Sequence, residues 1–149
     1  MREAKKKQRK FYSGKKKRHT LKTQVVEEKA NRKIICVSCC EGKKHDYQLF
    51  KDSGVRLNEQ TEQIMDSGYQ GAQRTHARTV LPQKKPRGGV LAKYQKCLNR
   101  QIARQRVLNE NVIGSIKRFR ILAERYRNRR KRYHLRVTLI AVIYNKEIE

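Results

Sequence analysis

The sequence has no apolar run long enough to cross a membrane. Its best candidate, Val137 to Tyr144, is eight residues long, whereas a membrane-spanning helix needs roughly 20 residues. The N-terminus, MREAKKKQRK, has no apolar stretch behind its charges, so we do not expect a secretory signal. These absences predict a cytoplasmic, nucleoid-associated protein with no membrane partner.

Cysteine is scarce, and its spacing does not favour a closed metal site. Of the four cysteines, Cys36 and Cys39 have the spacing of zinc ligands, but Cys97 has no paired neighbour and the four histidines are scattered. A structural zinc site needs four ligands. We therefore expect reduced thiols in and beside a buried strand, and no structural zinc.

Acidic residues are the scarcest charged class. The 149 residues include 39 Lys+Arg against 13 Asp+Glu, which gives a formal net charge of +26. Such a charge repels itself unless an anion lies against it, and nucleic acid is the usual partner. The length favours a single domain. We therefore expect one domain, residues 1–149, that binds nucleic acid.

By composition the chain divides into a basic arm (residues 1–18), a half rich in extended segments (19–89) and a helical half (90–146). The elements expected in the middle part are a hairpin of His19–Glu27 and Lys33–Cys40, a helix from His45–Asp46 to Ser53–Gly54, short strands at Gln63–Asp66 and Val80–Leu81, and a basic loop at Pro82–Gly89. Asp46 is the expected N-cap of that helix.

The helical half shows apolar residues at helical spacing. They are Tyr94, Leu98 and Ile102, then Val112, Ile113 and Ile116, and finally Leu135, Leu139, Val142 and Ile143 on one side of a last helix at about Arg130–Asn145. If that last helix is continuous with the preceding residues, Arg125, Arg129, Arg132 and Arg136 form one basic ridge. Such a ridge suits a phosphate backbone, although a solvated face is the ordinary alternative.

Two acids stand alone at the borders of strongly basic segments. Residues 67–109 contain ten Lys+Arg and no acid, and residues 111–146 contain eleven Lys+Arg and only Glu124. Asp66 and Glu110 border these segments, and the positive field favours their ionised forms. Carboxylates at a polyanion-binding surface make sense if a divalent cation lies between them and the phosphate.

That placement is typical of metal-assisted phosphodiester cleavage, in which two Mg²⁺ or Mn²⁺ ions bind the attacking and leaving oxygens and require hard oxygen ligands. On a helix, Arg106, Glu110 and Lys117 fall within about 40° of one another, so cations flank the acid. Each acid also has an ordinary interpretation. Asp66 can be a turn residue before Ser-Gly, and Glu110 can form an intrahelical ion pair with Arg106.

At these residues the sequence resembles bacterial insertion-sequence transposases of the DDE superfamily, the group related to Harbinger-type endonuclease domains. The stretches that carry the resemblance are YSGKKKRHTLKTQVV (12–26), GKKHDYQLFKDSG (42–54), MDSGYQGA (65–72), LPQKK (81–85), RVLNENVIGSIKRFRIL (106–122) and RYRNRRKRYHLRVTLIAVIYN (125–145). They follow the family's order and cover nearly the whole chain.

The resemblance implies an α/β, ribonuclease H-like core with Asp66 as the second and Glu110 as the third acid of a catalytic, metal-binding triad that holds two Mg²⁺ or Mn²⁺ ions. It implies hydrolysis at transposon ends and then attack of the freed 3′ hydroxyl on target DNA. His45, Asp46 and Tyr69 are expected near the acids without ligating metal. The cations expected to contact DNA are Lys15, Lys16, Lys17, Lys84, Lys85, Arg106, Lys117, Arg125, Arg129, Arg132 and Arg136.

Two departures from the family pattern matter. The family's first Asp lies on a strand upstream of the Tyr-Ser-Gly-Lys segment, where this chain offers only Glu3, and Asn111 stands where the family usually has His. We therefore expect an N-terminally incomplete DDE domain whose mixed sheet lacks its first strand, and which is inactive alone. It would be either the second half of a split transposase or a decayed copy, with an upstream half or a second copy as partner. The alternative is a non-enzymatic, ribosomal-type nucleic-acid-binding protein.

Overall fold

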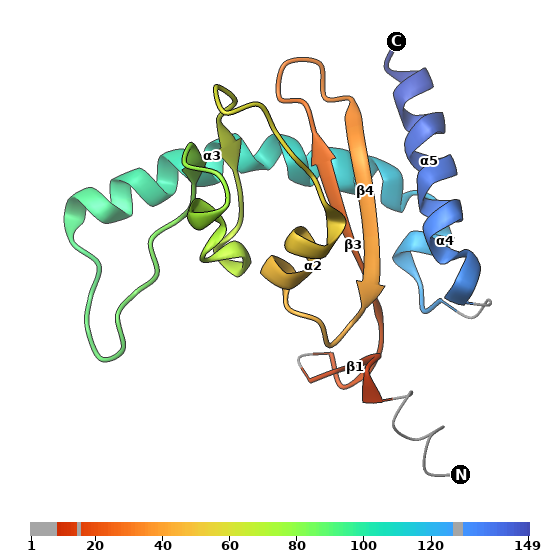
Figure 1. The fold of residues 1–149 in the computed structure, drawn as a ribbon, viewed down its shortest axis with the longest axis horizontal. Helices are drawn as coiled ribbons and strands as arrows, with labels where there is room; N and C mark the ends of the chain where they lie inside the picture. Colours follow the sequence, from red (N-terminus) through yellow and green to blue (C-terminus); the bar gives the residue numbers. More distant parts are fainter. Residues whose placement is uncertain (1–8, 15, 127–129) are drawn as a thin grey trace.

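A computed structural model describes residues 9–14, 16–126 and 130–149 (Figure 1). The strands are β1 (Tyr12–Ser13), β2 (Arg18–His19), β3 (Leu21–Glu27), β4 (Ile34–Glu41), β5 (Gln63–Ile64) and β6 (Thr79–Val80). The helices are α2 (Asp46–Ser53), α3 (Lys93–Lys117), α4 (Arg120–Ala123) and α5 (Tyr133–Glu147), and the 3₁₀ turns are η1 (Ser67–Tyr69), η2 (Ala72–Arg74) and η3 (Arg130–Arg132). The α/β class is confirmed. None of the described helices is long and apolar enough to cross a membrane.

The described strands form three separate two-stranded sheets. β1 pairs with β2 and β3 with β4, both antiparallel, whereas β5 and β6 are parallel. The described residues thus give an antiparallel pair, β3–β4, and a parallel pair, β5–β6, which share no hydrogen-bond ladder. The expected mixed sheet is therefore not continuous among these residues.

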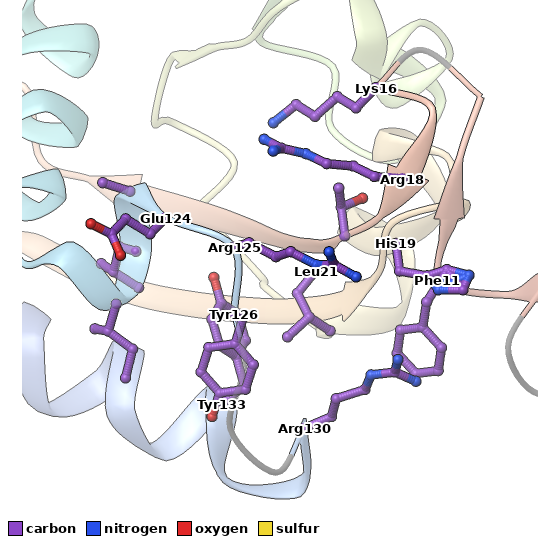
Figure 2. Close-up of a pocket in the computed structure, with 14 residues that line it drawn as sticks. Phe11, Lys16, Arg18, His19, Leu21, Glu124, Arg125, Tyr126, Arg130 and Tyr133 are labelled. Atoms are coloured by element: carbon purple, nitrogen blue, oxygen red, sulfur yellow. The ribbon is translucent and has the colours of Figure 1, made fainter.

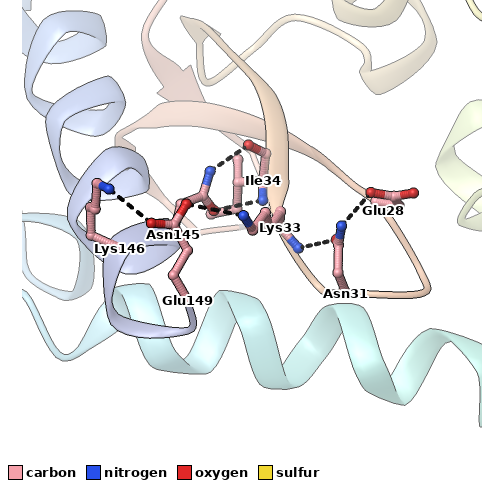
Figure 3. A network of polar contacts seen from close by, with 7 residues as sticks. All are labelled: Glu28, Asn31, Lys33, Ile34, Asn145, Lys146 and Glu149. Atoms are coloured by element: carbon pink, nitrogen blue, oxygen red, sulfur yellow. Dashed lines mark hydrogen bonds and ion pairs between the residues drawn. The ribbon is translucent and has the colours of Figure 1, made fainter.

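The β3–β4 hairpin is confirmed, and one end of it is tied to α5. A bulge after Val26 shifts the register and leaves Ile35 exposed. Beside the bulge, the Ile34 backbone N–H donates to Oδ1 of Asn145 at 2.8 Å, and the Ile34 carbonyl accepts from Nδ2 of the same residue at 2.9 Å (Figure 3). The Asn145 amide thus occupies backbone groups of β4 as a neighbouring strand would.

The main core lies between the hairpin, the C-terminal half of α3, and α5. Its buried residues are Ile34, Val112, Ile116, Ile140, Ala141 and Tyr144, with Val25, Val37, Phe119, Ile121 and Leu122 packed against them. The apolar stripe predicted over Val112 and Ile116 therefore faces this core. The same turns of α3 carry Glu110, so core packing fixes the position of that acid.

Two apolar stripes identified in the sequence are largely exposed. On α3, Ile102 is buried but Tyr94 and Leu98 are exposed, because the N-terminal half of the helix extends away from the rest of the molecule (Figure 1). On α5 the buried face is Tyr133, Val137, Ile140, Ala141 and Tyr144, and the opposite, exposed face is Leu135, Leu139, Val142 and Ile143. Because both faces of α5 are apolar, the periodicity alone could not choose between them.

Candidate functional site

Asp66 lies where the short parallel strand β5 ends and the turn η1 begins. The strand is extended by one bond, from the Met65 N–H to the carbonyl of Val80 at 3.0 Å. Asp66 then caps η1, because its Oδ1 accepts from the Ser67 N–H at 2.5 Å. The turn role considered from the sequence is therefore real, and it holds the Asp66 carboxylate at the end of the strand.

One guanidinium group joins the two isolated acids. Nη2 of Arg106, on α3, lies 3.3 Å from Oδ2 of Asp66 and 3.9 Å from Oε1 of Glu110. The intrahelical pair of Arg106 with Glu110 is therefore present, and Asp66 shares it. Both carboxylates are open to solvent, with 52% and 67% of the side chains exposed. Two acids far apart in the sequence thus face the same charge at an accessible surface.

The donor set fits a loosely held hard cation. Mg²⁺ is usually bound by one or two carboxylates together with waters and phosphate oxygens, and here two carboxylates already accept a shared positive group. Among the described residues no cluster of three or more His, Cys, Asp or Glu side chains is positioned to hold a metal. We call Asp66, Arg106 and Glu110 the Asp66–Arg106–Glu110 cluster; its two carboxylates could hold such a cation only together with further oxygen ligands.

His45 and Asp46, two of the residues expected beside the acids, lie at the N-terminus of α2. His45, not Asp46, is the N-cap, since its backbone is extended and its Nδ1 accepts from the Tyr47 N–H at 3.4 Å. Asp46 is the first helical residue and accepts from Nζ of Lys22 at 2.7 Å. The capping role predicted for Asp46 is therefore wrong by one position. Sequence reasoning also missed Lys22, which no local motif marks.

The N-terminus of α2 packs closely on the turn η1, which Asp66 caps. A Cβ atom on Gly68 would meet Oδ2 of Asp46 at 2.6 Å, so glycine in this turn permits the approach of Asp46. Tyr69 packs edge-on against Phe50, with ring centroids 6.4 Å apart. Burial, and then the negative charges of Asp46 and Asp66, raise the pKa of Tyr69 to about 12. Asp46 therefore lies against the turn η1, which Asp66 caps and to which Tyr69 belongs.

The other predicted DNA contacts are spread over the surface. Of the expected cations, Arg106 is the one that the described structure places against the acids. Lys16 and Lys17 lie in the β1–β2 turn, Lys84 and Lys85 in the exposed segment before α3, and Lys117 at the end of α3. Lys15 and Arg129 lie outside the described residues.

The basic ridge predicted for the last helix is wrong. Helix α4 ends at Ala123 because Glu124 has extended backbone angles, and α5 begins only at Tyr133. Arg125 lies in the intervening segment and Arg132 is the N-cap of α5. Arg136, inside α5, donates to the hydroxyl of Tyr126 at 2.7 Å. Among the described residues of the ridge, Arg125, Arg132 and Arg136 therefore do not share one helix face.

Three of the thiols lie on β4. Cys36, Cys39 and Cys40 are free and half-buried, and Cys97 is free and exposed on α3. Burial raises the pKa of Cys39 to about 11 and also raises the pKa of Cys40. Burial thus favours the neutral thiol at both positions.

Comparison with known proteins gives two matches. A family described as DDE superfamily endonuclease matches residues 1–145. The probable transposase for insertion sequence element IS702 of Microchaete diplosiphon is 48% identical over 144 residues, which is 97% of this chain and 52% of that protein. The chain thus spans about half the length of this curated relative. No solved structure matches significantly.

Proposed function

Because the chain belongs to the DDE superfamily of endonucleases, we propose that it carries part of the active site of an insertion-sequence transposase. In this proposal Asp66 and Glu110 hold Mg²⁺ or Mn²⁺, and the complete protein cuts transposon ends and joins them to target DNA. The observation that carries the proposal is the convergence of both carboxylates on Arg106, at 3.3 and 3.9 Å. The site of action would be the nucleoid.

The chain's own residues have separable tasks in this reaction. Bound divalent ions would supply Lewis acidity and activate the attacking oxygen. Asp66 and Glu110 supply hard oxygen ligands from a turn and from a core-anchored helix. Arg106 holds the two carboxylates together in the absence of substrate, and its guanidinium is suited to pair with a phosphate oxygen of DNA. Tyr69 and Asp46 support the turn that positions Asp66.

We infer that this site is completed from outside the chain. The resemblance implies three acids, and the Asp66–Arg106–Glu110 cluster supplies two. The third, with its strand, would come from transposase sequence beyond these residues or from a second copy, and the chain alone would be inactive. In this view the β3–β4 and β5–β6 pairs are parts of one ribonuclease H-like sheet that the missing strand would join.

The alternative function is non-enzymatic, ribosomal-type nucleic-acid binding. The net charge of +26 is compatible with it, but the family match does not favour it. It also gives no reason for two solvent-exposed acids to gather at one arginine in a chain with so few acids.

Metal titration separates the two functions. We would measure free Mn²⁺ by electron paramagnetic resonance during titration of the wild type, Asp66→Asn and Glu110→Gln. Each substitution should weaken binding about tenfold, since it removes one of two charged ligands. Glu59→Gln, which changes an exposed acid before β5, is the matched control. Equal Mn²⁺ affinity in all four proteins would contradict the proposed metal site.

A further inference from the structure

A polar hollow lies between the β1–β2 turn and the segment that joins α4 to α5. Its volume is about 160 Å³. Lys16 and Arg18 line it from the β1–β2 pair, and Arg125 and Arg130 line it from the segment between α4 and α5 (Figure 2). The residues come from opposite ends of the chain, so the hollow exists only in the folded molecule. We call the space lined by these four side chains the cationic hollow.

The charge of the cationic hollow is not balanced by acids. In the part of the chain that the structure describes, no carboxylate forms an ion pair with Lys16, Arg18, Arg125 or Arg130. One acid, Glu124, also lines the hollow, but Nε of Arg120 already binds it at 2.8 Å. Four like charges around one concave space repel each other. An anion bound there would therefore be stabilised.

The walls of the hollow are fixed by contacts that leave the positive charges in place. The guanidinium of Arg130 lies over the ring of Phe11, 4.1 Å from its centroid, and a cation–π contact holds an arginine without neutralising it. Tyr133 lines the opposite part of the hollow and shares a hydrogen bond with Oγ1 of Thr23 on β3 at 2.9 Å. The rings of Tyr126 and Tyr133 pack edge-on, 4.8 Å apart. The hollow is thus built before any ligand arrives, which lowers the entropy lost on binding.

We propose that the cationic hollow binds the phosphates of an unpaired DNA strand, at a site separate from the Asp66–Arg106–Glu110 cluster. Sites for single strands combine cations that follow the backbone with aromatic side chains, and here Phe11, Tyr126 and Tyr133 stand among the cations. The phosphates of a regular duplex lie on its convex outer surface. A strand that leaves the duplex can place a phosphate inside a concave wall.

The two sites lie on different flanks of the molecule. The start of α5 and helix α4 are on the other side of the β3–β4 hairpin from β5 and β6 (Figure 1). A strand held in the hollow would therefore be gripped away from the acids. The choice of DNA as ligand rests on the proposed function, whereas phosphate recognition does not depend on metal. Binding can be tested in EDTA, where the metal site contributes nothing.

The test compares strand binding after matched losses of charge. Fluorescence anisotropy in EDTA would give affinities for a short labelled single strand and for the blunt duplex of the same sequence. Arg18→Gln with Arg125→Gln should weaken single-strand binding at least about tenfold, since charge-assisted contacts are lost. Two lost contacts should lower the slope of log affinity against log salt by about 1.4. Duplex binding should change far less.

The control removes the same charge elsewhere. Arg100 and Arg104 are exposed on α3, so Arg100→Gln with Arg104→Gln tests the diffuse effect of net charge. If both double variants weaken single-strand binding equally, or if the hollow variant weakens duplex binding as much, the proposal is overturned. Arg18→Lys with Arg125→Lys keeps the charge and should keep most of the affinity. A loss equal to that of the glutamine pair would also overturn the proposal.

Discussion

The Asp66–Arg106–Glu110 cluster and the cationic hollow are two opposite arrangements of charge in one very basic chain. The cluster has two solvent-exposed acids that share one arginine, whereas the hollow has four cations and one acid already bound by Arg120. We propose that both surfaces meet DNA phosphates, the cluster through a divalent cation and the hollow directly. In these proposals, the position of the few acids separates a site for metal chemistry from a site for binding alone.

The two arrangements also differ in how they are built. Arg106 and Glu110 lie on α3 between Ile102 and Val112, which are 3% and 1% exposed, so a buried helix face fixes these two members of the cluster. The hollow depends on the docking of α5 against the β3–β4 hairpin. Tyr133, the first residue of α5, lines the hollow and shares a hydrogen bond with Thr23 of β3. A perturbation of α5 should therefore damage the hollow more than the cluster, although α5 also packs on the core that holds Glu110, and a change in the acids should damage the cluster alone.

The largest effect is expected from the acids in a complete transposase. Asp66→Asn or Glu110→Gln should lower Mg²⁺-dependent strand transfer at least about a thousandfold, since metal-ion stabilisation contributes several kcal/mol. Binding of DNA in EDTA should be kept or slightly strengthened, because a negative charge is removed. Strand-transfer gels and anisotropy would measure the two. Glu59→Gln is the control, and an Asp66→Asn enzyme as active as wild type would remove Asp66 from the mechanism.

The next effect tests the dependence of the hollow on α5. Asn145→Ala leaves the N–H and carbonyl of Ile34 without their partners, which should lower the free energy of unfolding by about 1–3 kcal/mol. Urea unfolding would measure this loss. Single-strand binding should weaken as well, and by more than Mn²⁺ affinity, because the α3 residues Val112 and Ile116 keep their other core contacts. Asn58→Ala, in the exposed segment before β5, should affect neither. If Asn145→Ala weakens Mn²⁺ binding as much as strand binding, the two sites are not independent.

Some of this could be predicted from the sequence because the signals were local. The hairpin follows from two β-branched runs and a short link, and the pairing of Val25 with Val37 confirms it. The end of α2 follows from Gly54, whose φ of 64° suits glycine. The isolation of Asp66 and Glu110 in basic segments drew attention to two residues that the fold brings to one arginine.

The rest could not be predicted because it depends on tertiary packing. Helix α5 is apolar on both faces, so the hairpin decided which face is buried. The break after α4 falls at Glu124 and Arg125, which are not helix-breaking residues, so the arginine spacing suggested a continuous ridge. The hollow joins residues near Lys16 to residues near Arg125, and no pattern in the sequence relates segments so far apart.

A smaller effect is expected from the shared arginine. Arg106→Gln removes the cation that competes for both carboxylates, and an exposed ion pair is worth less than about 1 kcal/mol. Mn²⁺ affinity should therefore rise, by about twofold to fivefold, while strand transfer by the complete protein falls because a phosphate contact is lost. Arg104→Gln, with the same loss of charge on the same helix, is the control. An equal rise in both variants would show that Arg106 has no special relation to the acids.

The smallest effect concerns an acid that belongs to neither site. Oε2 of Glu27 is buried without a hydrogen-bond partner, and burial raises the pKa of Glu27, although Asn109 and Arg32 partly offset this. The protonated form therefore favours folding below the unfolded pKa, and this contribution is lost as pH rises through the raised folded value. Glu27→Gln should flatten that loss and stabilise the protein slightly at neutral pH. Urea midpoints measured across the acid range would show it, with Glu59→Gln unchanged. An unaltered pH slope in Glu27→Gln would mean that the Glu27 carboxyl is solvated in solution.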